Sequence, residues 1–362
     1  MKKCFTLIIL CLLFAYNNIL QAQIGAALVN LQEQKLDKAK EAIDKALQNE
    51  KDARKSKAWF VKGEVYSGIA GSPIPAYANL DKNASQTAYE AYKKAMELEP
   101  QKKGYYKDAE NSIKSRLYPS AINQGVNLYK VKDYLNSLKA LDVAIDILPN
   151  DTTAIYYASA IAWEAKEYEK FIGYAEQVDK MKFSPATLKL NTLQLAYLYA
   201  GEKKDNAKAI ATLEKGIKTY PNEAEFWKLL GELYEQQGDK DKTIEFYERA
   251  ARQFPQEADY PKRLAFTYYN KAVELNKEIN KKKEAEGLTG ELKDPKKQQK
   301  AKEYNAIVDN ELKKAIPFAE KANQLKNGDF ETMDLLRFLY GTLGMKDKET
   351  DMDKKIKAMG KE

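Results

Sequence analysis

The chain has 362 residues and no histidine. This absence excludes Ser-His-Asp and Cys-His nucleophile systems, imidazole metal sites and histidine general bases. Its cysteines, Cys4 and Cys11, both fall in an N-terminal segment that we expect to be removed, so the remaining chain would have no disulfide and no thiol chemistry. The composition therefore favours a protein that binds another molecule over one that transforms it.

Neither sign of charge is in strong excess. The chain carries 60 Lys and Arg against 53 Asp and Glu, a net charge of +7. This excess is too small and too evenly mixed to indicate nucleic-acid binding. Hydrophobic residues make up 44% and charged residues 31%, the balance of a globular chain that is too long for one ordinary core.

Long hydrophobic runs are absent apart from Phe5–Tyr16. Lys2 and Lys3 precede this run and small and polar residues follow it, so residues 1–22 are predicted to be a cleaved signal peptide. The run is about half the roughly 20 residues of a membrane-spanning helix, so no transmembrane segment is expected after cleavage. We expect export to the periplasm of a Gram-negative bacterium, or association with its outer membrane.

Beyond residue 22, almost every segment carries apolar residues at intervals of three and four, and no stretch has a convincing period of two. The predicted fold class is therefore all-α. One segment shows a fuller pattern, in which a helix with a large, a small and an aromatic residue on one face is followed by a Gly stop and a partner helix. Its landmarks are Trp227, Leu230, Gly231, Tyr234, Gly238, Tyr247, Ala250 and Pro255.

This pattern resembles the tetratricopeptide repeat, with Thr243 where an Ala is usual and Tyr247 where a Phe is usual. Equivalent landmarks recur at a spacing of 34 residues, as in Gly231 and Ala265, and in Pro221 and Pro255. The resemblance covers nearly all of the chain after residue 22, as roughly eight helix pairs. It implies a right-handed superhelical solenoid of antiparallel helix pairs, in which small residues allow helix backbones to approach closely.

The repeats are interrupted in three places. A Gly/Pro-rich segment suggests a protruding loop over 67–87, residues 101–118 suggest an extra helix, and a Lys-rich segment suggests a long helical-hairpin insertion near the C-terminus. The lysines of this insertion are interleaved with acids, which favours a solvated face over an anion site. The predicted organisation after the signal is 23–118 N-terminal helix pairs, 119–270 regular repeats, 271–309 hairpin insertion, and 310–362 C-terminal repeat and capping helix.

Motifs for catalysis are missing from the sequence. There is no Gly-rich phosphate loop, no Asp-rich calcium loop and no pair of carboxylates set apart from the scatter of surface acids. We therefore expect no enzymatic activity, no cofactor and no metal. The function is expected to lie in recognition of another molecule.

In the tetratricopeptide family, the residue after the small position of each first helix lies on the concave groove, together with the residues four before and three after it. In the Trp227 repeat this rule selects Lys228, Glu232 and Glu235, which form an ordinary charged, solvent-exposed surface. In the three preceding repeats it selects a largely apolar, aromatic set that indicates a partner surface. The predicted peptide-binding residues are Ile122, Val126, Tyr129, Tyr156, Trp163, Leu193 and Tyr197.

An equally weighted alternative is that this stripe is covered by the protein itself. A charged second zone toward Lys262, Phe266 and Tyr269 could accept a more polar partner. The predicted function is a non-enzymatic scaffold or adaptor that holds a peptide segment of an envelope protein. A carbohydrate- or peptidoglycan-binding envelope protein is the runner-up, because Tyr and Trp also stack on sugars, and an unrecognised enzyme comes third. The oligomeric state is left open.

Overall fold

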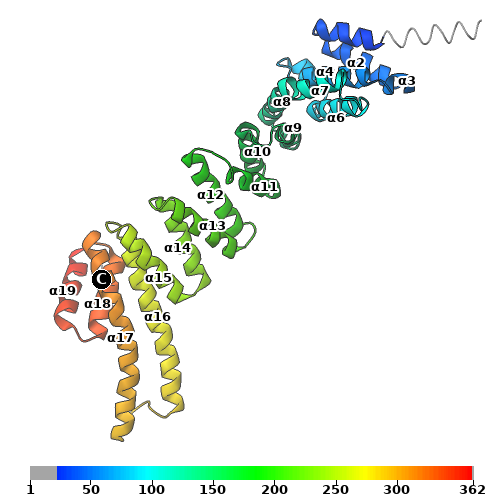
Figure 1. The fold of residues 1–362 in the computed structure, drawn as a ribbon. Coiled ribbons are helices and arrows are strands. Elements are labelled where there is room, and N and C mark those ends of the chain that lie inside the picture. Colours follow the sequence, from blue (N-terminus) through cyan, green and yellow to red (C-terminus); the bar gives the residue numbers. More distant parts are fainter. Residues whose placement is uncertain (1–22, 361–362) are drawn as a thin grey trace, which may run out of the picture. The chain divides into compact units, whose positions relative to one another are not determined.

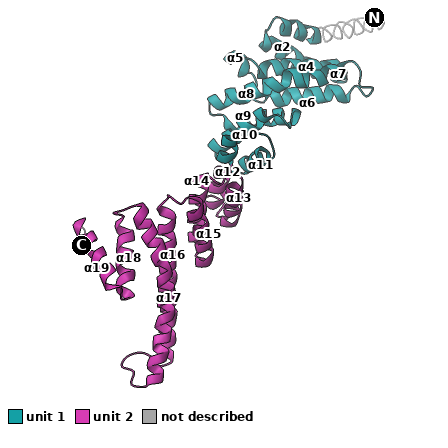
Figure 2. Cartoon of the chain, turned by 60° about the vertical axis from the view of Figure 1, so that its left-hand side comes forward, with its two compact units in different colours: residues 1–191 teal, residues 192–362 magenta. Residues whose placement is uncertain are grey.

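A computed structural model describes residues 23–360 (Figure 1). The predicted signal peptide lies outside these residues. Over the described range the chain forms helices and turns with no strand, which confirms the all-α prediction. The chain divides into two compact units, Met1–Asn191 and Thr192–Glu362, which we call unit 1 and unit 2 (Figure 2).

Unit 1 begins, in its described part, with a helical segment over 23–32. Successive helices then pack against one another, with the strongest contacts between α4 and α6 and between α8 and α9. The elements are α2 Leu36–Leu47, α3 Glu50–Ala53, α4 Ser56–Ala70, α5 Pro75–Ala78, α6 Ala84–Glu97, α7 Tyr105–Ser112, η1 Ile113–Leu117, α8 Tyr118–Lys130, α9 Tyr134–Ile147, α10 Thr152–Glu164 and α11 Tyr168–Val178.

The division between the units falls within α12, Pro185–Ala200. Unit 2 continues with helix pairs and contains the two longest helices, α16 and α17, which pack side by side. Its elements are α13 Asn206–Thr219, α14 Ala224–Gln237, α15 Lys240–Gln253, α16 Asp259–Ala285, α17 Pro295–Leu325, α18 Phe330–Thr342 and α19 Lys346–Ala358.

The segment predicted as a loop over 67–87 is more helical than expected. Helix α4 runs to Ala70 and α6 begins at Ala84, with the short α5 between them. The chain stays helical through Gly68 because Ser67, Ile69 and Ala70 are buried, and this packing outweighs the low helix propensity of glycine. The non-helical parts of the segment are therefore two short stretches, 71–74 and 79–83, on either side of α5.

The segment predicted as an extra helix joins α8 without a break. Helix α7 passes into the π-helical turn η1, which leads directly into α8 with Pro119 in its first turn. Proline has no N–H to donate, and its ring clashes with the carbonyl four residues earlier in a regular α-helix. The wider π-turn before Pro119 is a place where this mismatch can be absorbed.

Polar side chains define where several helices begin. At these N-caps a side-chain oxygen accepts a hydrogen bond from a backbone N–H of the first turn. Such caps tie the loops between helix pairs to the helices that follow. The capping residues are Asn49, Asp151, Asp205, Asp239, Asp294 and Asp329.

Glycines mark the closest approaches between the helices of a pair. A Cβ atom added to Gly63 of α4 would lie 2.5 Å from the Tyr92 ring of α6. At Gly125 of α8 it would lie 2.7 Å from the Cγ atom of Leu141 in α9. Since real Cβ atoms do not approach other atoms this closely, only glycine allows these helix pairs to pack as they do. This is the role predicted for the small repeat position.

Tyrosine hydroxyls connect successive repeats. The Tyr three residues after the small position donates a hydrogen bond to a carboxylate on the second helix of the preceding pair, an interaction that we call a tyrosine latch. The four latches are Tyr66 with Asp44, Tyr234 with Glu214, Tyr268 with Glu248 and Tyr340 with Glu320, at 2.7, 3.2, 3.3 and 2.7 Å.

Cations complete three of these latches. Arg249 donates to both oxygens of Glu214 at 3.1 Å, and Lys348 lies 2.9 Å from Glu320. Lys40 and Lys62 flank the first latch, at 2.8 and 3.3 Å from the carboxylate oxygens. The carboxylates are thus shared between a phenol and an ammonium or guanidinium group, which satisfies more of their lone pairs.

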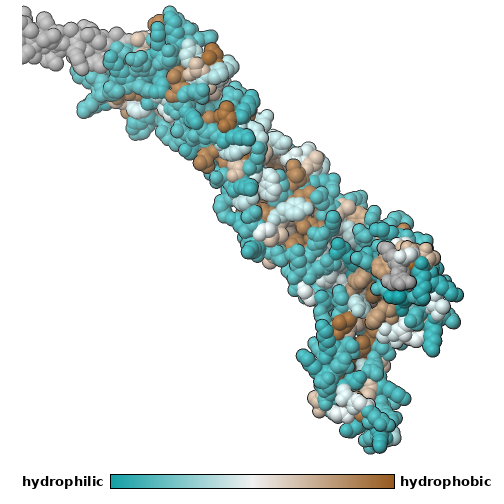
Figure 3. Space-filling model, turned by 180° about the vertical axis from the view of Figure 1, so that it is seen from behind, coloured by the Kyte–Doolittle hydropathy of each residue, from teal (hydrophilic) through white to brown (hydrophobic). Residues whose placement is uncertain are grey.

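Hydrophobic residues on the molecular face drawn in Figure 3 form separate patches between hydrophilic ones. Among the helices of the described part of the chain, none combines the length and the apolar character that crossing a bilayer requires.

The first prediction concerns close approach. Replacing Gly63 with Ala should lower the free energy of unfolding by about 1–3 kcal/mol, because the new methyl group overlaps the buried Tyr92 ring. The matched control is Gly173→Ala in α11, where a Cβ would meet nothing within 4 Å. This variant should gain about 0.5–1 kcal/mol from helix propensity. Urea unfolding measures both, and equal effects would contradict the role of close approach.

The second prediction concerns the latches at high pH. Burial and the nearby carboxylates raise the pKa of Tyr234 and Tyr268 to about 12, whereas an unfolded tyrosine titrates near pH 10. The latches therefore contribute fully below about pH 10, and their contribution is lost as the pH rises toward 12. The double variant Tyr234→Phe, Tyr268→Phe should be less stable at neutral pH by about 1 kcal/mol per hydrogen bond.

The same variant should lose less stability than the wild-type chain between about pH 9 and pH 11.5, since it lacks the two shifted phenols. Urea unfolding across this range tests the expectation. Tyr156→Phe serves as the control, because the Tyr156 ring is 49% exposed and its hydroxyl makes no hydrogen bond within residues 23–360. Parallel pH profiles for the double variant and the wild type would rule out the proposed contribution.

Candidate functional site

Two predicted residues, Ile122 and Val126, line a groove in unit 1 that we call the α8 groove. It has a volume of about 720 Å³. One wall is the turn that follows α4, the floor is α8, and Tyr157 of α10 closes one side. The full lining is Ala70, Gly71, Ser72, Pro73, Pro75, Ala78, Asn79, Ile122, Asn123, Gln124, Val126, Asn127, Leu128, Lys130, Val131 and Tyr157.

This lining is apolar with a few amides. Val131 is 71% exposed and Tyr157 is 38% exposed, so two hydrophobic side chains face solvent at its edge. Asn123 and Asn127, one helical turn apart on α8, have no side-chain hydrogen-bond partner in the described part of the chain. Lys130 is the one charged residue among these described lining residues. The groove therefore offers apolar contact and free amide groups, with little charge.

Tyr129 is engaged by its own chain. Its hydroxyl donates to Oε2 of Glu164 at 2.5 Å, and the hydroxyl of Tyr134 donates to the other oxygen at 3.2 Å. The bond to Glu164 is the main cause that raises the pKa of Tyr129 above its usual value. This cluster connects α8, α9 and α10. A partner could contact the Tyr129 ring, but its hydroxyl is already bonded.

Tyr156 and Trp163, both on α10, have different environments. The Tyr156 ring is 49% exposed and lies 5.9 Å from the Tyr157 ring and 6.4 Å from the Phe183 ring. The Trp163 ring is half-buried, and its centroid lies 5.1 Å from that of Phe171 in the partner helix α11. Tyr156 is thus open to a ligand, whereas Trp163 contributes to packing within its own helix pair.

The remaining predicted residues, Leu193 and Tyr197, belong to unit 2. Leu193 packs against the core that contains Trp227 and Leu230. Tyr197 is 47% exposed, and burial of the rest of its ring together with Glu225 and Glu232 raises its pKa. Leu193 therefore serves mainly in packing, whereas Tyr197 presents an aromatic surface.

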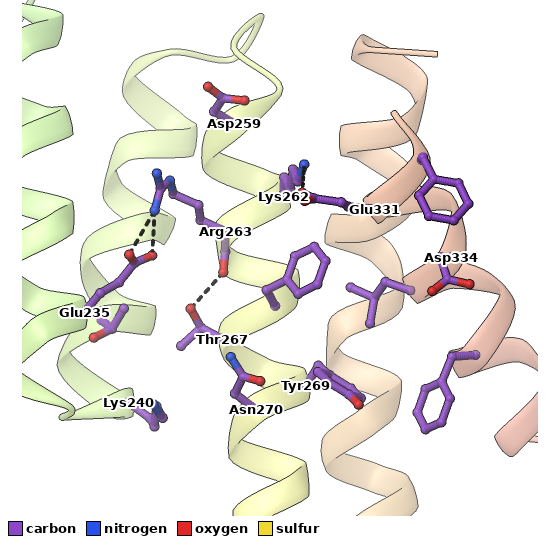
Figure 4. A pocket seen from close by; sticks show the side chains of 15 residues that line it. Glu235, Lys240, Asp259, Lys262, Arg263, Thr267, Tyr269, Asn270, Glu331 and Asp334 are labelled. Atoms are coloured by element: carbon purple, nitrogen blue, oxygen red, sulfur yellow. Dashed lines mark hydrogen bonds and ion pairs between the residues drawn. The ribbon is translucent and has the colours of Figure 1, made fainter. Parts of the chain in front are cut away.

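A second groove lies entirely in unit 2, with α16 as its floor, and we call it the α16 groove (Figure 4). Its volume is about 840 Å³. Helices α14 and α15 form one wall, and α18 forms the other. The lining residues are Glu235, Lys240, Thr243, Asp259, Lys262, Arg263, Phe266, Thr267, Tyr269, Asn270, Phe330, Glu331, Asp334, Leu335 and Phe338.

Ion pairs hold the walls of the α16 groove to its floor. Arg263 donates to both oxygens of Glu235, at 3.0 and 2.9 Å (Figure 4). Lys262 lies 2.6 Å from Glu331 and 2.8 Å from Asp329, the N-cap of α18. Although burial opposes it, the bonds from Lys262 and Thr332 hold the pKa of Asp329 below its usual value. These ion pairs connect α14, α16 and α18, the first helices of three consecutive repeats.

An aromatic surface occupies the rest of the α16 groove. The rings of Tyr269 on α16 and Phe338 on α18 meet edge to face with centroids 5.4 Å apart. Phe338 is 48% exposed. Lys262, Phe266 and Tyr269 were predicted to lie here, whereas Asp334 and Phe338 were not predicted. The same positional rule would have found both, because they lie three before and one after Arg337, the last repeat's counterpart of the small residue.

Within the described range, no group of three or more Asp, Glu, Cys or His side chains is arranged to hold a metal ion. The grooves contain amides, aromatic rings and paired charges. This chemistry suits binding through hydrogen bonds and apolar contact.

Stacked helix pairs whose small residues nest against the partner helix define a helical repeat protein. Residues 195–258 match the family model of the tetratricopeptide repeat. The TPR repeat-containing protein MJ1428 of Methanocaldococcus jannaschii is 26% identical over 180 residues, which cover 48% of this chain and 29% of that relative. The match thus spans less than a third of the relative's length. The family model thus shows a tetratricopeptide repeat over residues 195–258 of this chain.

Solved structures with a similar fold include a TPR repeats protein from Bacteroides fragilis NCTC 9343. It is 20% identical, covers 63% of this chain and 98% of its own, and has a TM-score of 0.48. YrrB, described as a TPR protein with an unusual peptide-binding site, is 16% identical, covers 68% of this chain and 97% of its own, and has a TM-score of 0.35. Tetratricopeptide repeats, such as the one matched over residues 195–258, generally serve as non-enzymatic protein–protein interaction scaffolds.

The third prediction separates packing from exposed positions on α10. Trp163→Ala should lower the free energy of unfolding by about 1–3 kcal/mol, because it removes a half-buried ring from its contact with Phe171. Tyr156→Ala should change it by less than about 0.5 kcal/mol, since that ring is largely exposed. Thermal or urea unfolding of the two variants distinguishes them. A larger loss at Tyr156 would mean that the exposed cluster is part of the core.

Proposed function

We propose that this protein is an exported scaffold or adaptor that holds an extended segment of a partner protein in the α8 groove. The observation that carries the proposal is the lining of that groove, in which apolar side chains, unpaired Asn123 and Asn127 amides and almost no charge occur together. The predicted residues Ile122 and Val126 contribute to it directly. Tyr129 on α8 and Tyr156 on α10 are further candidate contacts in the same unit.

The chemistry of the lining suggests what the partner segment contains. An extended peptide has a backbone N–H or C=O at every residue, and the two amides can donate to and accept from such groups. Its apolar side chains would cover Val126, Val131 and Tyr157. Each well-buried anchor contributes about 1–3 kcal/mol, so a few suffice for micromolar affinity. A basic segment would fit poorly, because no carboxylate is present among the described lining residues.

The predicted signal peptide supports a partner in the bacterial envelope. Export would bring the groove into contact with envelope proteins rather than cytoplasmic ones. Peptidoglycan, the alternative ligand, would also be met there and is distinguished by the experiment that follows.

The fourth prediction tests the α8 groove in intact cells. A photo-crosslinking amino acid at Tyr157 should attach the chain to one envelope protein, whereas the same amino acid at Lys139, an exposed position on α9, should not. Adding Val126→Asp should reduce the crosslink about tenfold, since it introduces an unpaired charge into an apolar contact. Mass spectrometry identifies the product. Crosslinks to cell-wall fragments, or equal products from Tyr157 and Lys139, would refute the proposal.

A further inference from the structure

The α16 groove is a second possible interaction surface, independent of the α8 groove. Its charges do not balance. Arg263 is matched by Glu235, and Asp334 is matched by Arg337 at 2.5 Å. Lys240 is matched by Glu274 at 3.6 Å. Lys262, by contrast, faces two carboxylates, Asp329 and Glu331.

Asp259 adds a further negative charge to the α16 groove. It lies in the first turn of α16 and has no ion-pair partner within the described residues. The N-terminal ends of α16 and α18 offset part of this charge through their dipoles. Glu331, however, has a side chain that is 71% exposed, so it can turn toward a partner without losing a buried contact. One end of the groove therefore retains an excess of carboxylate.

The aromatic end of the α16 groove lies at a fixed distance from these carboxylates. Phe266 follows Asp259 by seven residues on α16, which corresponds to about 10 Å along the helix axis. Tyr269 and the exposed Phe338 ring extend this apolar surface. A ligand that fills the groove must present a cation at one end and apolar side chains about two helical turns further on.

We propose that the α16 groove binds a basic amphipathic segment of a partner protein, with a Lys or Arg at Asp259 and Glu331 and apolar side chains on Phe266 and Phe338. Charge complementarity selects the basic side chains, and the aromatic rings supply the desolvated contact. Cations also pack favourably on aromatic faces, which adds to the preference. The α8 groove, with one charged lining residue, has no comparable selectivity for basic segments.

The experiment uses two labelled amphipathic helical peptides, one of leucine and lysine and one of leucine and glutamate. Fluorescence anisotropy with the full chain should detect the lysine peptide, with affinity that falls as salt is raised, and should detect the glutamate peptide at least about tenfold more weakly. The double variant Asp259→Asn, Glu331→Gln should weaken lysine-peptide binding about tenfold. Phe338→Ala should do so by a similar factor.

Matched controls are Glu245→Gln, an exposed carboxylate on α15, and Ile307→Ala, a 47% exposed side chain on α17. Both should leave the affinity within about twofold, as should Val126→Asp in the α8 groove. Circular dichroism checks that each variant is folded. Absence of lysine-peptide binding, equal binding of the two peptides, or an unchanged affinity in the double variant would overturn the proposal. None of these results depends on the partner of the α8 groove.

Discussion

Close packing of large side chains against glycine positions of the partner helix is the constraint on which the rest of this structure depends. At Gly63 and Gly125 the facing helix leaves no room for a single methyl group. Because the two helices of a pair approach so closely, their larger residues must interdigitate around the contact, and this fixes the face that each helix presents. A neighbouring face of each first helix, which includes the residue just after the small position, is then free to vary. The grooves of both units lie on that free face.

The tyrosine latches add a polar connection to this packing. Each connects one helix pair to the next, in the same direction along the chain, from a carboxylate to a tyrosine about twenty residues later. A repeat protein is stabilised mainly by contacts between neighbouring repeats, so a hydrogen bond at four of these junctions affects cooperativity as well as stability. The latches also account for part of the unusual tyrosine content, since these hydroxyls are structural.

Much of the fold was predictable from the sequence because its cause is local and periodic. The 34-residue spacing between Gly231 and Ala265 reflects one helix pair, and the contacts at such positions occur within or between neighbouring pairs. The exceptions arise where packing outweighs local preference. Gly68 lies inside α4 because the residues around it are buried, and Pro119 lies inside a continuous helical run because a π-turn precedes it.

The candidate sites were less predictable, because they depend on side chains from segments that sequence spacing does not connect. The wall of the α8 groove comes from the irregular turn after α4, whose course no repeat landmark specifies. Tyr129 satisfies the groove rule, yet its hydroxyl is bonded to Glu164 on another helix. In the last repeat Arg337 replaces the small residue. Phe338 was therefore not predicted, because the groove positions are counted from the small residue.

The two grooves differ in chemistry although both are built on the same repeat architecture. Stacking requires a small residue and a nearby aromatic on each first helix, but it places no demand on the residue just after the small one. That position is Val126 in one groove and Phe266 in the other, and the residue four before it is Ile122 or Lys262. Substitutions there change recognition with little effect on the fold, because the altered side chains face the groove. Two chemically distinct surfaces on one chain are what a scaffold requires if it is to bring different partners together.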